Sequence, residues 1–79
     1  MTKKAIPLND LKKGSTGKII EIQGGHGFHR RLNVLGIRRG QIARILSKQP
    51  LRGPLTIAIG STQMTIGRGM ASKIYVEEI

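Results

Sequence analysis

Residues 25–40 read GHGFHRRLNVLGIRRG, a short amphipathic segment that glycines bracket at both ends. Phe28, Leu32 and Leu35 are spaced at i, i+4 and i+7, which places them on one face of a helix. Gly36 follows at the position where a left-handed residue ends a helix. The segment therefore predicts one short helix whose apolar stripe packs on another part of the chain. It holds no pair of nucleophile and base and no set of metal ligands with carboxylates, so it favours docking over catalysis.

Short β-rich runs separated by turn residues surround this helix. Residues 6–11 read as a leading strand that turns at Asn9 and Asp10. Gly60, Ser61 and Thr62 suit a hairpin turn with glycine at a positive φ. Because a short antiparallel sheet hides its edges best by curling on itself, we predict an all-β fold, a small SH3-like barrel of short strands with one short helix. The further strands are expected at residues 18–23, 41–48, 55–59, 63–66 and 74–78.

The length of 79 residues predicts a single domain, residues 1–79, with room for one core. The chain has no Cys, so disulfides and thiolate metal sites cannot brace it, and an ordinary reducing cytoplasm is the expected compartment. Residues 1–6 contain two lysines with no apolar run behind them, and no later segment approaches the ~20 apolar residues of a membrane span. We therefore expect an untargeted, soluble protein.

A formal net charge of +10 is extreme for this length and predicts attraction to an anionic partner. Nucleic acid, an anionic membrane surface and an acidic protein surface all satisfy the same electrostatics. Charge alone therefore leaves the three partners open, and a highly charged surface can also serve solubility alone.

A family resemblance appears once the glycine and strand patterns are combined. It is carried by Gly17, by residues 22–24, by the string Arg31-Leu32-x-x-Leu35-Gly36-Ile37-x-x-Gly40, by Pro50 and Gly53-Pro54-Leu55, and by Ala71 with residues 74–76. With these residues the chain resembles the FeoA family of ferrous-iron transport accessory proteins over nearly its whole length. A similar pattern recurs in the carboxy-terminal domain of iron- and manganese-responsive repressors, but this chain lacks the helical domains that precede it there.

The resemblance implies a cytoplasmic regulatory partner of the FeoB ferrous-iron transporter, which acts on or near the GTP-binding portion of that transporter. It also implies that the protein is not itself a pump or a GTPase. The residues agree, because the chain has no Gly-x-x-x-x-Gly-Lys phosphate loop, and the lone pair Gly67-x-Gly69 is too weak a signal. No cofactor is expected.

Metal binding centres on His26 and His29, which are three residues apart and could share a helix face. Ferrous iron prefers histidines combined with carboxylates, and none of the four acidic residues lies near this pair in the sequence. We therefore expect no physiological metal site here: His26 would help to start the helix, and His29 would lie on its solvent side.

The expected partner-binding residues are Arg30, Leu51, Arg52 and Arg68. Arg30 points away from the apolar helix stripe, whereas Arg31 borders it and is expected to be half-buried, bonded to backbone carbonyls or to Glu21. Arg38 and Arg39 are further candidates for contact with an acidic partner, and any such arginine can also be plain solvated surface.

The segment Leu51-Arg52-Gly53-Pro54 is a candidate partner-facing loop, because Pro50 and Pro54 stiffen it. An exposed Leu beside Arg would suit a docking contact, and the alternative is that Leu51 folds back on the barrel. Met64 and Met70 are expected to fill the core.

The main alternative function is a small basic barrel that binds RNA or another nucleic acid. Binders of single strands usually stack bases on aromatic side chains, and this chain has only Phe28 and Tyr75. An enzyme is not expected, because the sequence offers no paired carboxylates, Ser/His/Asp set or activated Cys. The number of copies that assemble stays open.

Overall fold

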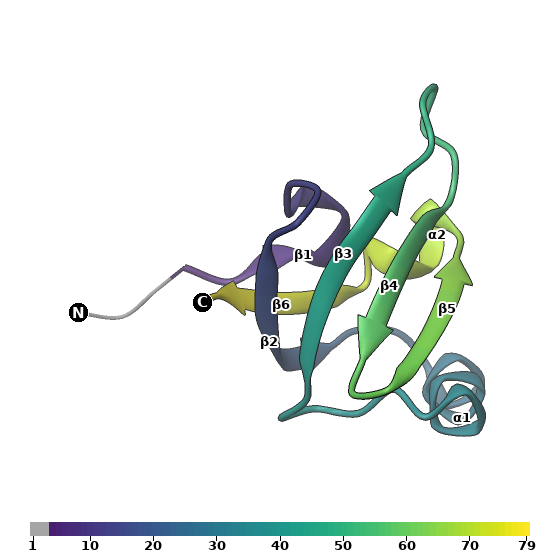
Figure 1. The fold of residues 1–79 in the computed structure, drawn as a ribbon. Helices are drawn as coiled ribbons and strands as arrows, with labels where there is room; N and C mark the ends of the chain where they lie inside the picture. The colour runs from purple at the N-terminus through teal and green to yellow at the C-terminus, as the bar shows by residue number, and fades with distance from the viewer. Residues whose placement is uncertain (1–3) are drawn as a thin grey trace.

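A computed structural model describes residues 4–79 (Figure 1). In this structure, short runs rich in β-branched residues form six strands, and turn residues separate the strands. The prediction of a strand over residues 6–11 is mostly wrong, because a 3₁₀ turn buries Leu8 there after only two strand residues. In chain order the elements are β1 (Ile6–Pro7), the 3₁₀ turn η1 (Leu8–Asp10), β2 (Thr16–Ile22), α1 (His26–Leu35), β3 (Ile42–Lys48), β4 (Leu55–Ile59), β5 (Thr62–Ile66), α2 (Arg68–Ala71) and β6 (Ile74–Glu78).

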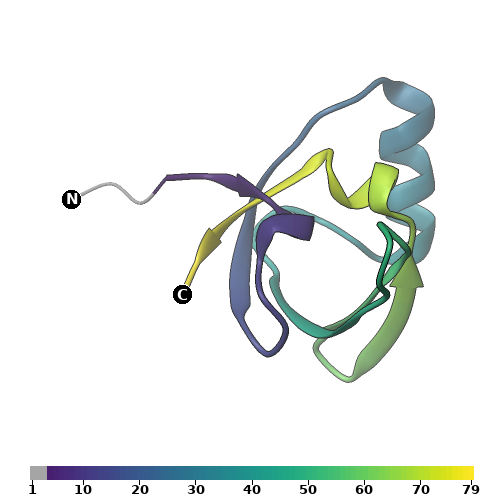
Figure 2. The same ribbon diagram turned by 90° about the horizontal axis from the view of Figure 1, so that it is seen from above.

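The strands form one antiparallel sheet in the order β1, β6, β2, β3, β4, β5. Figure 2 shows this sheet curling round on itself, as the predicted SH3-like barrel requires. The pairing of β3 with β4 shifts register between Ile45 and Ser47. A bulge of this kind bends a strand and increases its twist.

The predicted hairpin between β4 and β5 is present, with a turn shorter by one residue than expected. Ile59 pairs directly with Thr62, so only Gly60 and Ser61 form the loop. Gly60 has a φ of +61°. A positive φ at the first loop residue gives a turn whose twist matches that of the flanking strands, so this hairpin fixes the register of β5.

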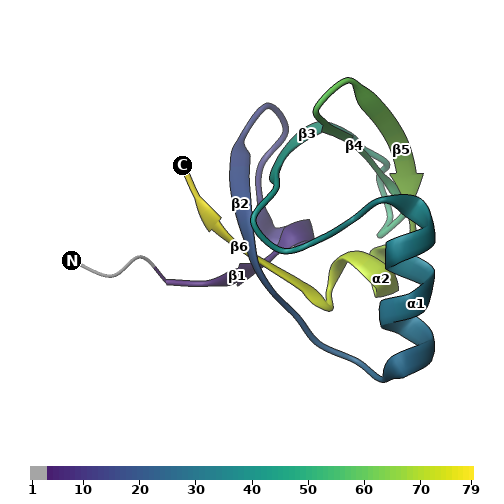
Figure 3. The ribbon, with the colours of Figure 1, turned by 90° about the horizontal axis from the view of Figure 1, so that it is seen from below.

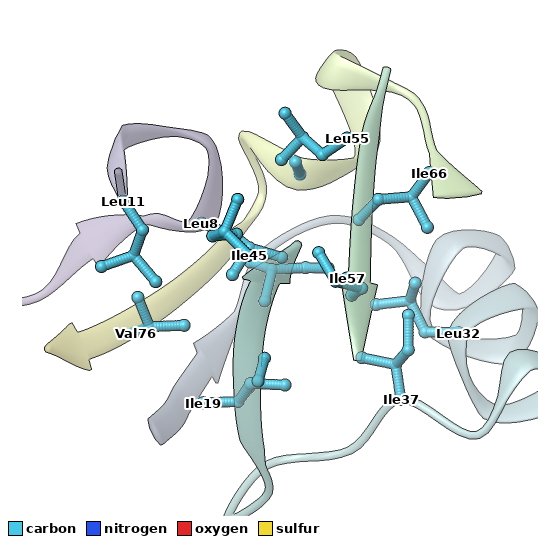
Figure 4. Packing of buried hydrophobic residues seen from close by; sticks show 13 residues of the cluster. Leu8, Leu11, Ile19, Leu32, Ile37, Ile45, Leu55, Ile57, Ile66 and Val76 are labelled. Carbon is cyan, nitrogen blue, oxygen red and sulfur yellow. The ribbon is translucent and has the colours of Figure 1, made fainter. Parts of the chain in front are cut away.

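The apolar core lies inside the curl of the sheet (Figure 4). Met64 and Met70 pack against it, as predicted. Full burial of one Leu or Ile side chain contributes roughly 1.5–3 kcal/mol, so this cluster accounts for the stability of a chain without disulfides. Its members are Leu8, Leu11, Ile19, Leu32, Ile37, Ala43, Ile45, Leu55, Ile57, Ile66, Ala71, Ile74 and Val76.

Helix α1 ends at Gly36 as predicted. Gly36 has a φ of +86°, and its amide donates to the carbonyls of Leu32 and Asn33. The amide of Ile37 donates to the Leu32 carbonyl at 2.9 Å. Together these bonds form a Schellman motif, in which the residue after the left-handed glycine packs back on the helix. The motif buries Ile37 beside Leu32 in the core.

The rotation of α1 about its own axis differs from the prediction. Leu32 is buried, but Leu35 is 41% exposed and Arg31 is exposed, so the expected burial of Arg31 against Glu21 is wrong. Positions 31 and 35 share one flank of the helix, and this flank faces solvent. The opposite flank, which carries His29, faces Glu21 across a cleft.

The described residues 4–79 share one sheet and one core, while the prediction of a single domain over 1–79 also includes residues outside that range. Residues 1–3 lie outside the described part of the chain. The expectation of an untargeted protein rests on residues 1–6, so half of that segment lies outside the description. Between residues 4 and 79, neither helix has the length and apolarity needed to span a bilayer.

Candidate docking surface

The connection between β3 and β4 projects from one end of the barrel as a narrow hairpin (Figure 1). The amide of Gln49 donates to the Pro54 carbonyl at 3.0 Å, and the amide of Gly53 donates to the Pro50 carbonyl at 3.2 Å. These two bonds close a tight turn around two central residues. We call residues 50–53 the hairpin tip.

The two central residues of the hairpin tip are held in a left-handed conformation that side chains disfavour. Leu51 has a φ of 59° and Arg52 a φ of 62°. Two successive positive φ angles define a type I′ turn, for which Asn-Gly is the favoured sequence. Each L-residue with a side chain in this region costs roughly 1–2 kcal/mol. Strain of this size at an exposed position points to a functional constraint.

The side chain of Leu51 is 98% exposed, so it points into solvent and does not fold back on the barrel. Arg52 beside it is also exposed. The hairpin tip therefore presents an apolar side chain next to a cation on a turn that two hydrogen bonds close. Packing within the described residues does not explain the position of Leu51, because its side chain is almost fully exposed. Arginine is enriched at the residues that dominate binding energy in interfaces, so Arg52 with the exposed Leu51 makes the hairpin tip a candidate docking element.

The four predicted partner-binding residues do not form one surface. Leu51 and Arg52 lie together in the hairpin tip, whereas Arg30 is exposed on α1 at the opposite end of the barrel (Figure 1). Figure 3, seen from below, shows α1 at the near end of the barrel, on the side of β5 and α2. Arg68 is the first residue of α2 and is half-buried. A single flat partner surface cannot cover the hairpin tip and α1 together.

His26 and His29 are both exposed on α1, and His26 is the first residue of the helix. The ring of His29 lies edge-on to Phe28, with ring centroids 6.4 Å apart. Among residues 4–79, no three His, Cys, Asp or Glu side chains gather in a group that could hold a metal ion. Glu21 lines the same cleft as His29, but within the described range these side chains belong to no group of three potential ligands.

Gln41 is a functional candidate that the sequence reasoning missed. Its side-chain amide bonds to the backbone at both Gly36 and Arg38 and thereby braces the loop between α1 and β3. The loop carries Arg38 and Arg39 beside the helix. In the sequence, Gln41 is only a polar residue at the start of a strand, and this signal does not distinguish it from ordinary surface.

Comparison with known proteins identifies the family. The sequence matches the model of the FeoA domain over residues 6–78. This chain belongs to the FeoA family. The family is involved in ferrous-iron transport, and it is a transport-accessory family rather than a known enzyme family.

Two FeoA relatives cover nearly the whole chain. The first is the protein of Methanocaldococcus jannaschii named Putative Fe(2+) transport protein A, which is 35% identical over 72 residues, or 91% of this chain and 85% of the relative. The second is the crystal structure of an iron uptake regulatory protein (FeoA), with a TM-score of 0.86 and 28% identity over 96% of this chain and 99% of the other. Both the family resemblance and the SH3-like fold are therefore confirmed.

A manganese-dependent transcriptional repressor contains the same fold. It superposes with a TM-score of 0.89 and 25% identity over all of this chain but only 44% of the repressor. The FeoA-family chain therefore corresponds to less than half of that repressor.

Proposed function

We propose that this FeoA-family protein is a cytoplasmic accessory and regulatory protein of ferrous-iron uptake, which acts by contact with the FeoB transporter at its cytoplasmic GTP-binding portion. Membership of the family supports the process. The observation that carries the mode of action is the hairpin tip, where strained backbone holds Leu51 98% exposed. No catalytic step is needed for this role.

The proposed contact combines an apolar anchor with electrostatic attraction. Leu51 enters an apolar pocket on the partner, and Arg52 pairs with a carboxylate at its rim. The net charge of +10 attracts an acidic partner surface and accelerates the encounter. Arg30 acts at most in this long-range attraction, since α1 lies at the other end of the barrel. Arg68 follows two residues after Ile66, which pairs with Leu55 at the base of the hairpin tip, so it is the nearer of the two arginines to the contact.

The net charge is also compatible with the alternative function, nucleic-acid binding. The placement of the aromatic side chains gives little support to stacking on bases. Phe28 is half-buried, and the Lys73 Nζ lies 5.1 Å from its ring centroid. That face of the ring is therefore not open for stacking on a base. Binding through phosphates alone would be lost steeply as salt is added.

A pull-down tests the proposed function. Tagged protein is incubated with membranes that hold the transporter, in parallel samples with and without nuclease. We expect the transporter to be retained equally in both. Retention that disappears after nuclease treatment would contradict a protein contact and support the nucleic-acid alternative.

Two matched variants test the role of the hairpin tip in the same assay. Leu51→Asp places a charge on the anchor and should reduce retention about tenfold or more. Ile79→Asp makes the same kind of change at a side chain that is 63% exposed at the far end of the chain, and it should leave retention unchanged. Equal retention of both variants would remove the hairpin tip from the proposal.

A further inference from the structure

A cleft of about 550 Å³ lies beside α1, at the end of the barrel away from the hairpin tip. One wall is the helix flank that carries His29 and Asn33, and the loop after the helix adds Arg38 and Arg39. Glu21 of β2 forms the facing wall. The volume falls in the range of roughly 300–1,000 Å³ that is typical of ligand sites.

The backbone beneath the two arginines of the cleft is fixed by hydrogen bonds. Gln41 Nε2 donates to the Gly36 carbonyl at 2.9 Å, and the Arg38 amide donates to Gln41 Oε1 at 2.8 Å. The amide of Gly40 donates to the Ile19 carbonyl at 2.7 Å, which ties the loop to β2. A ligand therefore meets a loop that is already ordered, and the entropic cost of binding is reduced.

The two arginines are not neutralised by neighbours. Within residues 4–79, neither the Arg38 nor the Arg39 guanidinium takes part in a hydrogen bond or an ion pair. The carboxylate of Glu21 accepts a hydrogen bond from Gln23 Nε2 at 3.1 Å instead. Two free guanidinium groups at a concave site attract an anion, and each can hold a carboxylate or phosphate through two parallel bonds.

The other groups of the cleft favour a peptide over a phosphate-rich ligand. Glu21 repels a dense array of phosphates but can accept hydrogen bonds from peptide amides. His29 and Asn33 both donate and accept, as recognition of a peptide backbone requires. No Phe, Tyr or Trp lines the cleft to stack a base, and a concave site suits a protruding segment better than a flat lipid surface.

We propose that this cleft binds an acidic peptide segment of a partner protein, with a carboxylate held by Arg38 and Arg39 and backbone amides facing Glu21. This site is separate from the hairpin tip. The identity of the partner as the transporter rests on the proposed function, whereas the acidic chemistry of the segment rests on the cleft alone.

The first test is a titration of the ¹⁵N-labelled full chain, followed by its amide NMR signals at ~0.15 M salt. The probe is a short peptide of alternating glutamate and leucine, and the control peptide alternates lysine and leucine. We expect the acidic peptide alone to shift signals of residues 29–41 and of Glu21. Absent shifts, or shifts of equal size at Lys12 and Lys13, would overturn the proposal. Larger shifts with inorganic phosphate or with phosphatidylglycerol vesicles would also overturn it.

Charge variants make the test specific to the cleft. Arg38→Glu with Arg39→Glu should weaken binding of the acidic peptide about tenfold or more. The control pair Lys12→Glu with Lys13→Glu changes the net charge equally, on exposed residues of the turn before β2, and should weaken it much less. Equal losses in both pairs would mean that the peptide senses net charge only, and would overturn the cleft site.

A second variant keeps the test valid if the double arginine variant fails to fold. Glu21→Gln removes the negative charge from the cleft wall but keeps a side-chain oxygen that can accept from peptide amides. It should therefore strengthen binding of the acidic peptide about twofold or more, because only the repulsion is lost. Asp10→Asn, at the exposed last residue of η1, makes the same charge change and should have a smaller effect. Unchanged or weaker binding in Glu21→Gln would contradict the proposed arrangement.

The same variants separate this proposal from the proposed function. If the wild-type chain binds the glutamate-leucine peptide in the cleft but does not retain the transporter, the proposed function fails and the cleft site stands. If the transporter is retained equally by wild type and by the double arginine variant, and the peptide does not bind, the cleft site fails and the proposed function stands.

Discussion

At the scale of single residues, Leu51 and Arg52 are the least expected feature of the molecule. A left-handed turn of two residues is normally built from Asn and Gly, and the chain instead places two bulky side chains there. Neither side chain packs on the core, so folding alone gives no reason for the choice. A contact outside the chain gives one, because it needs Leu51 to stay 98% exposed.

Replacement of the strained pair should therefore stabilise the protein while it removes the contact. Leu51→Asn with Arg52→Gly provides residues that adopt a positive φ readily, and we expect the free energy of unfolding to rise by ~1 kcal/mol or more. Chemical denaturation measures this change, and the pull-down measures the loss of transporter retention. A variant that is less stable, or that still retains the transporter, would contradict the functional reading of the strain.

Gly36 is the second residue whose conformation decides a local structure. An added Cβ at Gly36 meets no atom within 4 Å, so the cost of a side chain there comes from its φ of +86° alone. Gly36→Val should lower the free energy of unfolding by roughly 1 kcal/mol or more. A thermal melt with an unchanged midpoint would refute this prediction. The control is Val34→Ala on α1, which should change the midpoint little because the Val34 side chain is 82% exposed.

At the scale of elements, the sequence predicts those parts whose signals are local. The strands Leu55–Ile59 and Ile74–Glu78 are found at the predicted residues, because turn residues flank the first run on both sides and precede the second. The helix end at Gly36 was also predictable from a single glycine. The rotation of α1 was not, since it depends on which side of the helix packs on the core, and this is a tertiary contact. For that reason Arg31 was expected to be half-buried and is exposed.

The loop between α1 and β3 depends on one side chain. Gln41→Ala removes both the donor to the Gly36 carbonyl and the acceptor of the Arg38 amide. With about 1 kcal/mol for each hydrogen bond, we expect a loss of roughly 1–2 kcal/mol in the free energy of unfolding. Hydrogen exchange at the Arg38 amide should accelerate in parallel. An unchanged exchange rate at the Arg38 amide would show that the hydrogen bonds of Gln41 do not stabilise the loop. The matched control is Gln63→Ala, at an exposed residue of β5.

At the scale of the whole molecule, the structure separates two features that the sequence could not place. The hairpin tip and the cleft beside α1 lie at opposite ends of the barrel, because the β3 and β4 strands carry the tip away from the helix. Spacing along the chain does not reveal this, since residues 39 and 51 are only one strand apart in sequence. The chain has a net charge of +10, which favours acidic partners at both features.

Iron itself should not bind tightly to the isolated protein. His26 and His29 are exposed, and residues 4–79 contain no cluster of three potential ligands around them. Isothermal titration with Fe(II) under anaerobic conditions should therefore detect no site with a Kd below about 1 μM. Binding below that value, lost in His26→Ala with His29→Ala, would contradict this account of the helix.

We propose that the protein acts on iron uptake through a contact made by its hairpin tip. The most direct measurement is the rate of ferrous-iron uptake by cells in which Leu51→Asp replaces the native chain, with Ile79→Asp as the control and equal amounts of folded protein in both. We predict impaired uptake with Leu51→Asp and normal uptake with Ile79→Asp. Full uptake by correctly folded Leu51→Asp protein would contradict the account.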